Sequence, residues 1–433
     1  MKNKETIEQT VAKRKIVLAN KFIYRILDKI VIKRILQPKY HVSYDIKDDI
    51  NKEEGPCFLV YNHSSRSDYI WITQSISPRR ANFVTGYNEF FRSKFKGIFD
   101  ILHQIPKKNF TNDMICMKGM KRVIDKGGIV AFSPEGMSCV NGHNQPVVPG
   151  TGKLFRHYNI PVYCLHISGG FLTNHKVCLD DRPGKVDVTF FKLFTKEDTQ
   201  TLTPEEMDRK LDVALWNDDY EWNKEHHYKF KTKGNACDHM HDLLYKCPRC
   251  GAEFKMIGEK DTIKCLECGS GATLNDYYEL KPLDDTCVIP ESPSKWDDWE
   301  RSVVIKEIKN PEFKMEFDCG IGELPKYKYL KDPMTGVPCG SGHVLIDHDG
   351  FHFKGTRDGK PFEFTLAWPN LYSLLYVTDM TYFQTYVDGE YIEFYPKDAI
   401  VGKTRLVVEE MHRYHGGKWQ NFPWMEHLYK DEE

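Results

Sequence analysis

Two short apolar segments, each running into a polar motif, limit the possible folds most strongly. Residues 55–60 lead into Asn62 and His63, and residues 129–132 lead into Ser133-Pro134-Glu135-Gly136. Short apolar runs of this kind are typical of buried strands. Further strands are expected at 160–167 and 186–191, with helices at 114–126, 152–158 and after the Thr203-Pro204 cap. This alternation predicts an α/β domain over about residues 50–230.

The polar motifs carry groups suited to proton transfer. His63 is followed five residues later by Asp68. An imidazole titrates near neutral pH, and a carboxylate on its other ring nitrogen would fix the tautomer. The turn at Pro134-Glu135-Gly136 could present a carboxylate and a bare backbone amide to a polar substrate.

These motifs, in this order, resemble those of the glycerolipid acyltransferase family (lysophosphatidic acid acyltransferase-like, HxxxxD type). Asn62, His63, Ser65 and Asp68 fit its NHxSxxD block, and residues 132–136 fit its FPEG block with Ser133 inserted. The resemblance implies a mixed sheet flanked by helices. It also implies transfer of a fatty acyl group from a thioester of acyl carrier protein or coenzyme A to a hydroxyl of a lysophospholipid such as 1-acylglycerol-3-phosphate.

The resemblance assigns roles to individual residues. His63 is the expected general base, paired with Asp68. Asn62, Ser65, Glu135 and Gly136 are expected in substrate binding, the last two against the polar group of the acceptor. Lys107 and Lys108 lie where the family usually has an acceptor-contacting Arg.

The sequence also departs from the family pattern. Met137-Ser138-Cys139 stands where Thr-Arg-Ser is usual. The missing Arg motivates an alternative acceptor, such as an amino- or glycolipid. A third alternative, from another functional class, is a catalytically silent lipid-binding scaffold, against which the intact His63–Asp68 pair argues.

Four cysteines form a metal-ligand pattern. Cys247 and Cys250, then Cys265 and Cys268, make two CxxC pairs separated by 14 residues, and each is followed by Gly. Four thiolates give closed tetrahedral Zn²⁺ coordination, which is structural rather than catalytic. We expect a zinc ribbon over 240–280, with mixed local charge that argues against nucleic-acid binding.

The last third of the chain has strand-and-turn character. Alternating segments between 343 and 395 are separated by Asp349-Gly350, Asp358-Gly359 and Asp388-Gly389, which are hairpin signals. A closing helix is expected at 404–415. Residues 285–425 are therefore expected to form an antiparallel β domain, which loosely resembles pleckstrin-homology-like modules.

The N-terminal segment is basic and amphipathic. Apolar residues recur through 11–36 between Lys and Arg, with Asp28 the only acid there. Such a helix can lie in a bilayer interface, so residues 1–45 are expected to be a helical, membrane-interfacial region preceding an acyltransferase domain at 46–235.

Bulk composition points to a reducing compartment. The chain has 433 residues, a net charge of −1 and 13 Cys, with no stretch approaching 18 uninterrupted apolar residues. An odd, clustered cysteine count and no recognisable secretory signal predict a cytoplasmic protein, peripheral on the inner face of the membrane.

Overall fold

The computed structural model describes residues 5–174, 176–177, 180–331 and 336–417. Its first sheet has seven strands, ordered β1-β7-β6-β2-β5-β3-β4. Neighbouring strands are parallel except β6 and β7, so the sheet is mixed, as predicted. The strands are β1 (His41–Ile46), β2 (Cys57–Tyr61), β3 (Ala81–Gly86), β4 (Ile105–Lys107), β5 (Ile129–Phe132), β6 (Val162–Ser168) and β7 (Lys185–Phe194).

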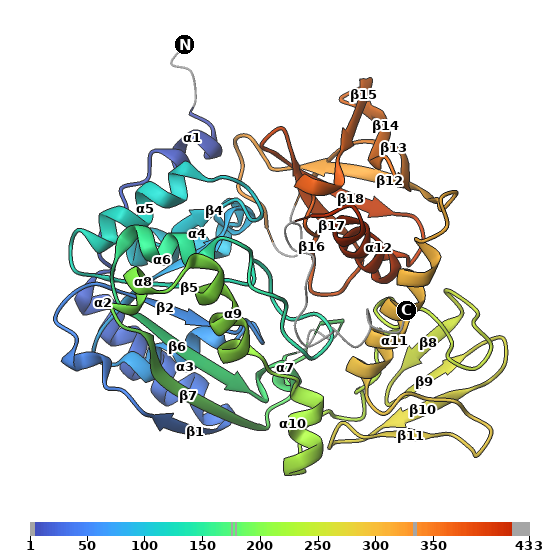
Figure 1. Cartoon of the computed structure of the whole chain (residues 1–433), viewed down its shortest axis with the longest axis horizontal. Coiled ribbons are helices and arrows are strands. Elements are labelled where there is room, and N and C mark those ends of the chain that lie inside the picture. The colour runs from blue at the N-terminus through green and yellow to red at the C-terminus, as the bar shows by residue number, and fades with distance from the viewer. Residues whose placement is uncertain (1–4, 175, 178–179, 332–335, 418–433) are drawn as a thin grey trace.

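Helices cover both faces of this sheet (Figure 1). Central strands β2 and β5 are wholly buried. The predicted helix start at Thr203 is confirmed, and it forms a capping box: the Thr203 hydroxyl accepts from the Glu206 amide, and the Glu206 carboxylate accepts from the Thr203 amide. The helices are α3 (Asp68–Ile76), α4 (Ser93–Leu102), α5 (Met114–Ile124), α6 (Thr151–Tyr158), α7 (Gly170–Thr173), α8 (Asp198–Thr201), α9 (Pro204–Leu215) and α10 (Asp219–His226), with short 3-10 turns η3 (Ile50–Lys52) and η4 (Tyr87–Phe91).

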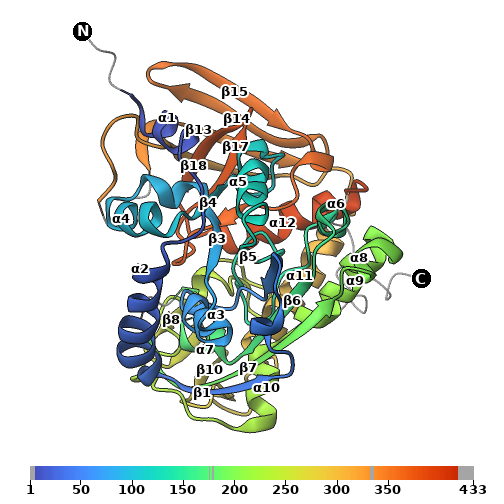
Figure 2. The ribbon, with the colours of Figure 1, turned by 90° about the vertical axis from the view of Figure 1, so that its left-hand side faces the viewer.

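The N-terminal region differs from the expected single helix over 11–36. A short helix α1 (Ile7–Ala12) is followed by irregular chain, and α2 (Lys21–Ile26) begins only at the Asn20 cap. It continues as the π-helical η1 (Leu27–Leu36), the turn η2 (Gln37–Lys39) and strand β1. Figure 2 shows α2 and η1 along one side of the molecule.

Part of the apolar surface of α2 and η1 faces outward. Tyr24 and Ile32 are buried, but Phe22, Ile26 and Ile30 are exposed. No helix in the described ranges combines the length and apolar character needed to cross a bilayer.

A small four-stranded sheet follows the first domain. Its strands are β8 (Met256–Glu259), β9 (Thr262–Cys265), β10 (Gly271–Leu274) and β11 (Leu280–Pro282), all antiparallel to their neighbours. The connecting segment is polar and His-rich, yet it is packed against its surroundings: Phe230, Cys237 and Leu244 are fully buried. The turn η5 (Met240–Asp242) lies within it.

The C-terminal region forms a second seven-stranded sheet, entirely antiparallel, in the order β15-β14-β13-β12-β18-β17-β16. The predicted hairpins at Asp358-Gly359 and Asp388-Gly389 are confirmed, with positive φ at both positions of each turn. The turn predicted at Asp349-Gly350 lies one residue earlier, at His348-Asp349, since Asp347 pairs with Gly350. The elements are α11 (Pro293–Glu307), β12 (Met315–Glu323), β13 (Val337–Asp347), β14 (Gly350–Arg357), β15 (Lys360–Leu366), η6 (Trp368–Asn370), β16 (Leu375–Tyr376), β17 (Phe383–Val387), β18 (Glu390–Pro396) and the closing helix α12 (Val401–Tyr414).

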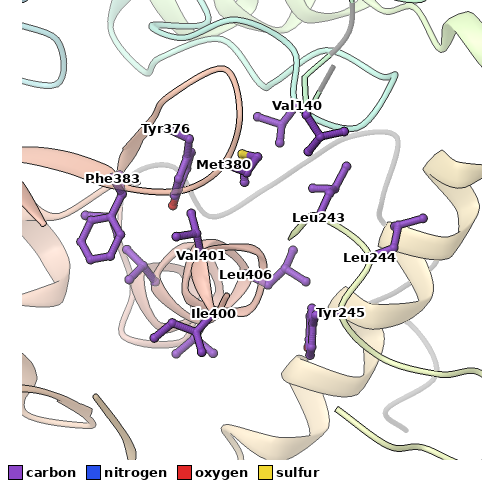
Figure 3. Packing of buried hydrophobic residues seen from close by; sticks show 14 of the residues in the cluster. Val140, Leu243, Leu244, Tyr245, Tyr376, Met380, Phe383, Ile400, Val401 and Leu406 are labelled. Carbon is purple, nitrogen blue, oxygen red and sulfur yellow. The ribbon is translucent and has the colours of Figure 1, made fainter. Parts of the chain in front are cut away.

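One hydrophobic cluster joins the three regions. Val140, from the loop after Gly136, belongs to the same buried cluster as Leu244 and as Tyr376 and Met380 of the C-terminal region. Figure 3 shows these side chains gathered around α12. The C-terminal β region is therefore packed onto a loop that borders the candidate site.

Candidate functional site

The sheet topology brings the two polar motifs together. Strands β2 and β5 are adjacent and parallel, with Val60 opposite Phe132. The residues that follow each strand therefore emerge side by side at the carboxyl end of the sheet, where open α/β sheets bind ligands. Asn62 and His63 follow β2, and Ser133 to Gly136 follow β5.

His63 and Asp68 form a hydrogen-bonded pair. His63 Nδ1 lies 2.7 Å from Asp68 Oδ2. The other carboxylate oxygen, Oδ1, accepts from the Ser65 amide at 2.9 Å and from Ser64 Oγ at 3.1 Å. With Nδ1–H donated to Asp68, the Nε2 atom of a neutral His63 carries a lone pair. The Asp68 side chain is buried, whereas that of His63 is 35% exposed.

The pair borders a large cavity. The cavity has a volume of about 1660 Å³ and is lined by both His63 and Asp68. Apolar side chains from α2, η1 and α4 cover one part of it, among them Leu27, Val31 and Phe99. Typical small-molecule pockets have about 300–1,000 Å³, so this cavity has room for long-chain amphiphiles.

Glu135 does not line the cavity but binds the backbone of the loops around it. Its side chain is fully buried, and its oxygens accept from the His63 amide at 2.9 Å and the Gln145 amide at 3.0 Å. Burial raises the pKa of Glu135 well above its usual range, although these two bonds oppose that shift. Each of its carboxylate oxygens thus holds a backbone amide, and a contact between Glu135 and an acceptor stays a prediction.

Asn62 likewise positions the backbone. Its Nδ2 donates to the Ile167 carbonyl and its Oδ1 accepts from the Ile167 amide, both at 2.8 Å. These two hydrogen bonds to β6 fix the start of the loop that carries His63. Ser65 does line the cavity, with its Oγ accepting from the Ser67 amide.

Gly136 and Lys107 line the cavity, whereas Lys108 points elsewhere. Gly136 adopts φ +76°, and a Cβ there would lie 2.8 Å from the Phe110 ring. Lys107 Nζ donates to the carbonyls of Lys108 and Thr111, and burial lowers the pKa of Lys107. Lys108 Nζ donates to the Gly389 carbonyl in the β17–β18 turn, so it links this loop to the C-terminal sheet.

Other cavity residues gave no signal in the sequence. Lys176 is buried, and desolvation lowers its pKa to about 8. Asn370, Tyr372 and Gln384 come from the C-terminal sheet region. Only the tertiary packing of that region against the first domain brings them to the cavity.

The four cysteines of the two CxxC pairs converge. Their sulfur atoms lie within 4.8 Å of one another, with Cys247 to Cys268 at 3.6 Å and Cys250 to Cys265 at 3.8 Å. Sulfurs on a tetrahedral zinc with Zn–S near 2.3 Å would be about 3.8 Å apart. Gly251 and Gly269 adopt φ +74°, as tight turns after each pair require. This donor set could hold Zn²⁺.

A second buried polar group lies between the regions. His143 Nε2 lies 3.1 Å from Asp298 Oδ1, and Asn141 Nδ2 donates to Asp297 Oδ2 at 2.6 Å. Asp297 also pairs with Arg405. These contacts connect the loop after Gly136 to α11 and α12.

Part of the chain is similar to known proteins. Residues 41–168 match the protein family described as Acyltransferase. The chain is also similar, at 15% identity and a TM-score of 0.39, to the crystal structure of the 1-acyl-sn-glycerophosphate (LPA) acyltransferase PlsC from Thermotoga maritima, over 45% of this chain and 77% of that one. Among curated proteins, none shows significant similarity to the chain. The matched segment, which contains His63, Asp68 and Glu135, is similar to the Acyltransferase family.

Proposed function

We propose that this acyltransferase moves a fatty acyl group from a thioester, on acyl carrier protein or coenzyme A, to a hydroxyl of a lysophospholipid. The observation that carries the proposal is the His63–Asp68 pair at the edge of a large, partly apolar cavity. A base beside such a cavity suits an acceptor that is itself an amphiphile. A phosphate-bearing acceptor such as 1-acylglycerol-3-phosphate would meet Lys107 there.

The geometry supports a direct transfer. His63 Nε2 takes the proton of the acceptor hydroxyl while the oxygen attacks the thioester carbonyl, and Asp68 stabilises the imidazolium that forms. The tetrahedral intermediate then collapses, the C–S bond breaks, and the imidazolium returns the proton to the thiolate. An ester and a free thiol result, and no enzyme nucleophile is needed.

We further propose that Cys247, Cys250, Cys265 and Cys268 hold a structural Zn²⁺. The ion would stabilise the small β8–β11 sheet by joining its two CxxC turns. The exposed apolar residues of α2 and η1, interspersed with Lys21, Arg25 and Lys29, would hold the enzyme to the cytoplasmic face of an anionic membrane.

The proposal is tested by product detection. Purified protein on lipid vesicles is given acyl-carrier-protein or acyl-coenzyme A thioesters and a panel of lysolipids that includes amino- and glycolipids, and products are identified by mass spectrometry. We expect an ester product that His63→Ala abolishes and that His343→Ala, on an exposed histidine outside the cavity, leaves unchanged. A folded wild type that acylates none of these acceptors would refute the proposal and favour a lipid-binding scaffold.

A further inference from the structure

A buried cluster between the loop after Gly136 and α11 brings together three side chains of the kinds that bind metal ions. His143 comes from the loop, and Asp297 and Asp298 come from α11. One ligand atom of each lies within 4.8 Å of the other two, and His143 Nε2 lies 3.1 Å from Asp298 Oδ1. All three side chains are buried, and none of them lines the cavity that contains His63. The cluster is therefore separate from the site proposed for acyl transfer.

The side-chain amide of Asn141 points into this cluster. Its Nδ2 lies 2.6 Å from Asp297 Oδ2 and 2.8 Å from His143 Nε2. Asn141 is only 1% exposed, yet its Oδ1 has no hydrogen bond to any described residue. Asp218, whose backbone pairs with that of His143, likewise buries an oxygen, Oδ2, to which no group in the described ranges donates. Two buried oxygens in this neighbourhood thus lack the positively polarised partner that buried polar atoms require.

The contacts inside the cluster cannot all be hydrogen bonds while both aspartates are ionised. A protonated His143 Nε2 would donate to Asp298 but would meet the amide N–H of Asn141. An unprotonated Nε2 would accept from Asn141 but would face the lone pairs of Asp298. Turning the Asn141 amide over would bring its Oδ1 against the carboxylate of Asp297. Each arrangement therefore sets two donors or two acceptors against each other.

A divalent cation among these four side chains removes the conflict. With the Asn141 amide turned over, all four present lone pairs to the ion: one imidazole nitrogen and three oxygens. The distances between these positions are 2.6, 2.8 and 3.1 Å. Neighbouring ligand atoms on an octahedral ion with bonds of about 2.1 Å lie about 3.0 Å apart. Mostly oxygen ligands with this spacing favour an ion of the Mn²⁺ type.

The groups around the cluster orient the ligands as they would in a metal site. His143 Nδ1 lies 3.2 Å from the Asn144 carbonyl, so an Nδ1–H donated there leaves the Nε2 lone pair for a metal. Arg405 binds Asp297 through Oδ1, whereas Oδ2 is the oxygen that faces Asn141. Metal-binding carboxylates are commonly held by such a second partner.

We propose that His143, Asp297, Asp298 and Asn141 bind one divalent cation of the Mn²⁺ type. The ion would be distinct from the Zn²⁺ proposed for the four cysteines, and it would tie the loop after Gly136 to α11. The same loop supports the candidate active site, because the Cys139 amide donates to the His63 carbonyl at 2.8 Å. The role is structural and does not depend on which acyl acceptor the enzyme uses.

Mn²⁺ binding tests this site without any measurement of acyl transfer. Zinc-loaded, full-length protein is titrated with Mn²⁺, and the free ion is measured by electron paramagnetic resonance. We expect about one Mn²⁺ per chain, since the soft thiolates of the cysteine site do not favour this ion. His143→Ala and Asp298→Asn should weaken binding by at least about tenfold. His343→Ala is the matched control, because this exposed histidine also lies 3.0 Å from an aspartate, Asp318, and should bind Mn²⁺ as wild type does.

Asn141→Asp separates a metal site from a network of ion pairs alone. A third carboxylate should tighten Mn²⁺ binding, and Mn²⁺ should raise the melting temperature of this variant more than that of wild type. A melting temperature that Asn141→Asp lowers equally with and without Mn²⁺ would overturn the site. So would a folded wild type that binds no Mn²⁺, or equal binding by wild type and every variant. If the variants do not fold, the stoichiometry and the Mn²⁺-dependent melting of wild type still decide.

Discussion

Buried carboxylates shape the backbone around His63 more than they face substrate. Glu135 binds two amides, and Asp212 Oδ1 accepts from the Val147 amide at 2.7 Å in the loop that returns from Gly136 to α6. The sequence identified the motif residues, but it did not show which of their carboxylates bind backbone amides and which face the cavity. Whether a carboxylate points toward the cavity or into the protein depends on amides that are distant in sequence.

The buried carboxyl of Asp212 leads to a prediction about how the stability of the fold depends on pH. Burial raises its pKa to about 7, whereas an unfolded Asp titrates near ~3.9. Between these two pH values, Asp212 is protonated in the folded protein but ionised in the unfolded chain. Relative to high pH, the protonation of Asp212 therefore contributes stability that is fully present below about pH 4 and is lost as the pH rises to about 7. Asp212→Asn keeps the oxygen that accepts from Val147 and removes the titration.

We expect Asp212→Asn to be more stable than wild type at pH 8, by at most about 4 kcal/mol, and the difference to shrink as pH falls toward 5. Urea denaturation at several pH values measures it. Asp125→Asn, on an exposed carboxylate directly after α5, is the control. Parallel stability–pH curves for wild type and Asp212→Asn would contradict the assignment.

At the scale of elements, local sequence patterns predicted the strands and turns well, whereas elements stabilised by contacts between distant residues were missed. The apolar runs identified β2, β5 and β6, and two of the Asp-Gly pairs lie in the hairpin turns of the C-terminal sheet. Helix α11 was missed because its buried face includes charged residues, such as Asp297 and Arg301. Their partners Arg405 and Glu409 lie more than 100 residues away, so no local pattern reports their burial.

The small β8–β11 sheet predicts a dependence on metal. We expect about one Zn²⁺ per chain by elemental mass spectrometry, and loss of that metal together with a lower melting temperature in Cys265→Ser. Cys339→Ser, outside the four-sulfur set, should retain both. Full stability of a metal-free Cys265→Ser protein would rule out a structural ion.

The outward face of α2 and η1 predicts membrane binding. Ile26 and Ile30 are 39% and 48% exposed. Replacing both by Ser should weaken co-sedimentation with anionic vesicles by at least about tenfold, since each buried isoleucine contributes about 1.5–3 kcal/mol. Val213→Ser, at an exposed residue of α9, serves as the comparison. Equal binding by both variants would place the membrane contact elsewhere.

At the scale of the whole molecule, a buried ionic network joins α11 and α12 to the loop after Gly136. Arg301 pairs with Glu409 and Glu410 at 2.5 and 2.7 Å, and Arg405 pairs with Asp297, which accepts from Asn141. Together with the shared hydrophobic cluster, this network predicts that the regions unfold as one cooperative unit.

Arg405→Met tests that prediction. The substitution leaves Asp297 buried without its cation and leaves Glu409 with Arg301 alone, so we expect a loss of about 3–5 kcal/mol in the free energy of unfolding. Lys397→Met removes an exposed pair and should cost at most about 1 kcal/mol. Separate transitions for the two ends of the chain in wild type, seen by calorimetry, would show that the network does not couple them.

The most direct test of the account is a double-mutant cycle on the His63–Asp68 pair. The second-order rate of acyl transfer is measured for wild type, His63→Ala, Asp68→Asn and the double variant. Each single variant should lose about 10²–10⁴ in rate, and the double variant should be no slower than His63→Ala, because the carboxylate acts through the imidazole. Independent, multiplicative losses, or a His63→Ala enzyme at near-normal rate, would contradict a base–orienter pair at this site.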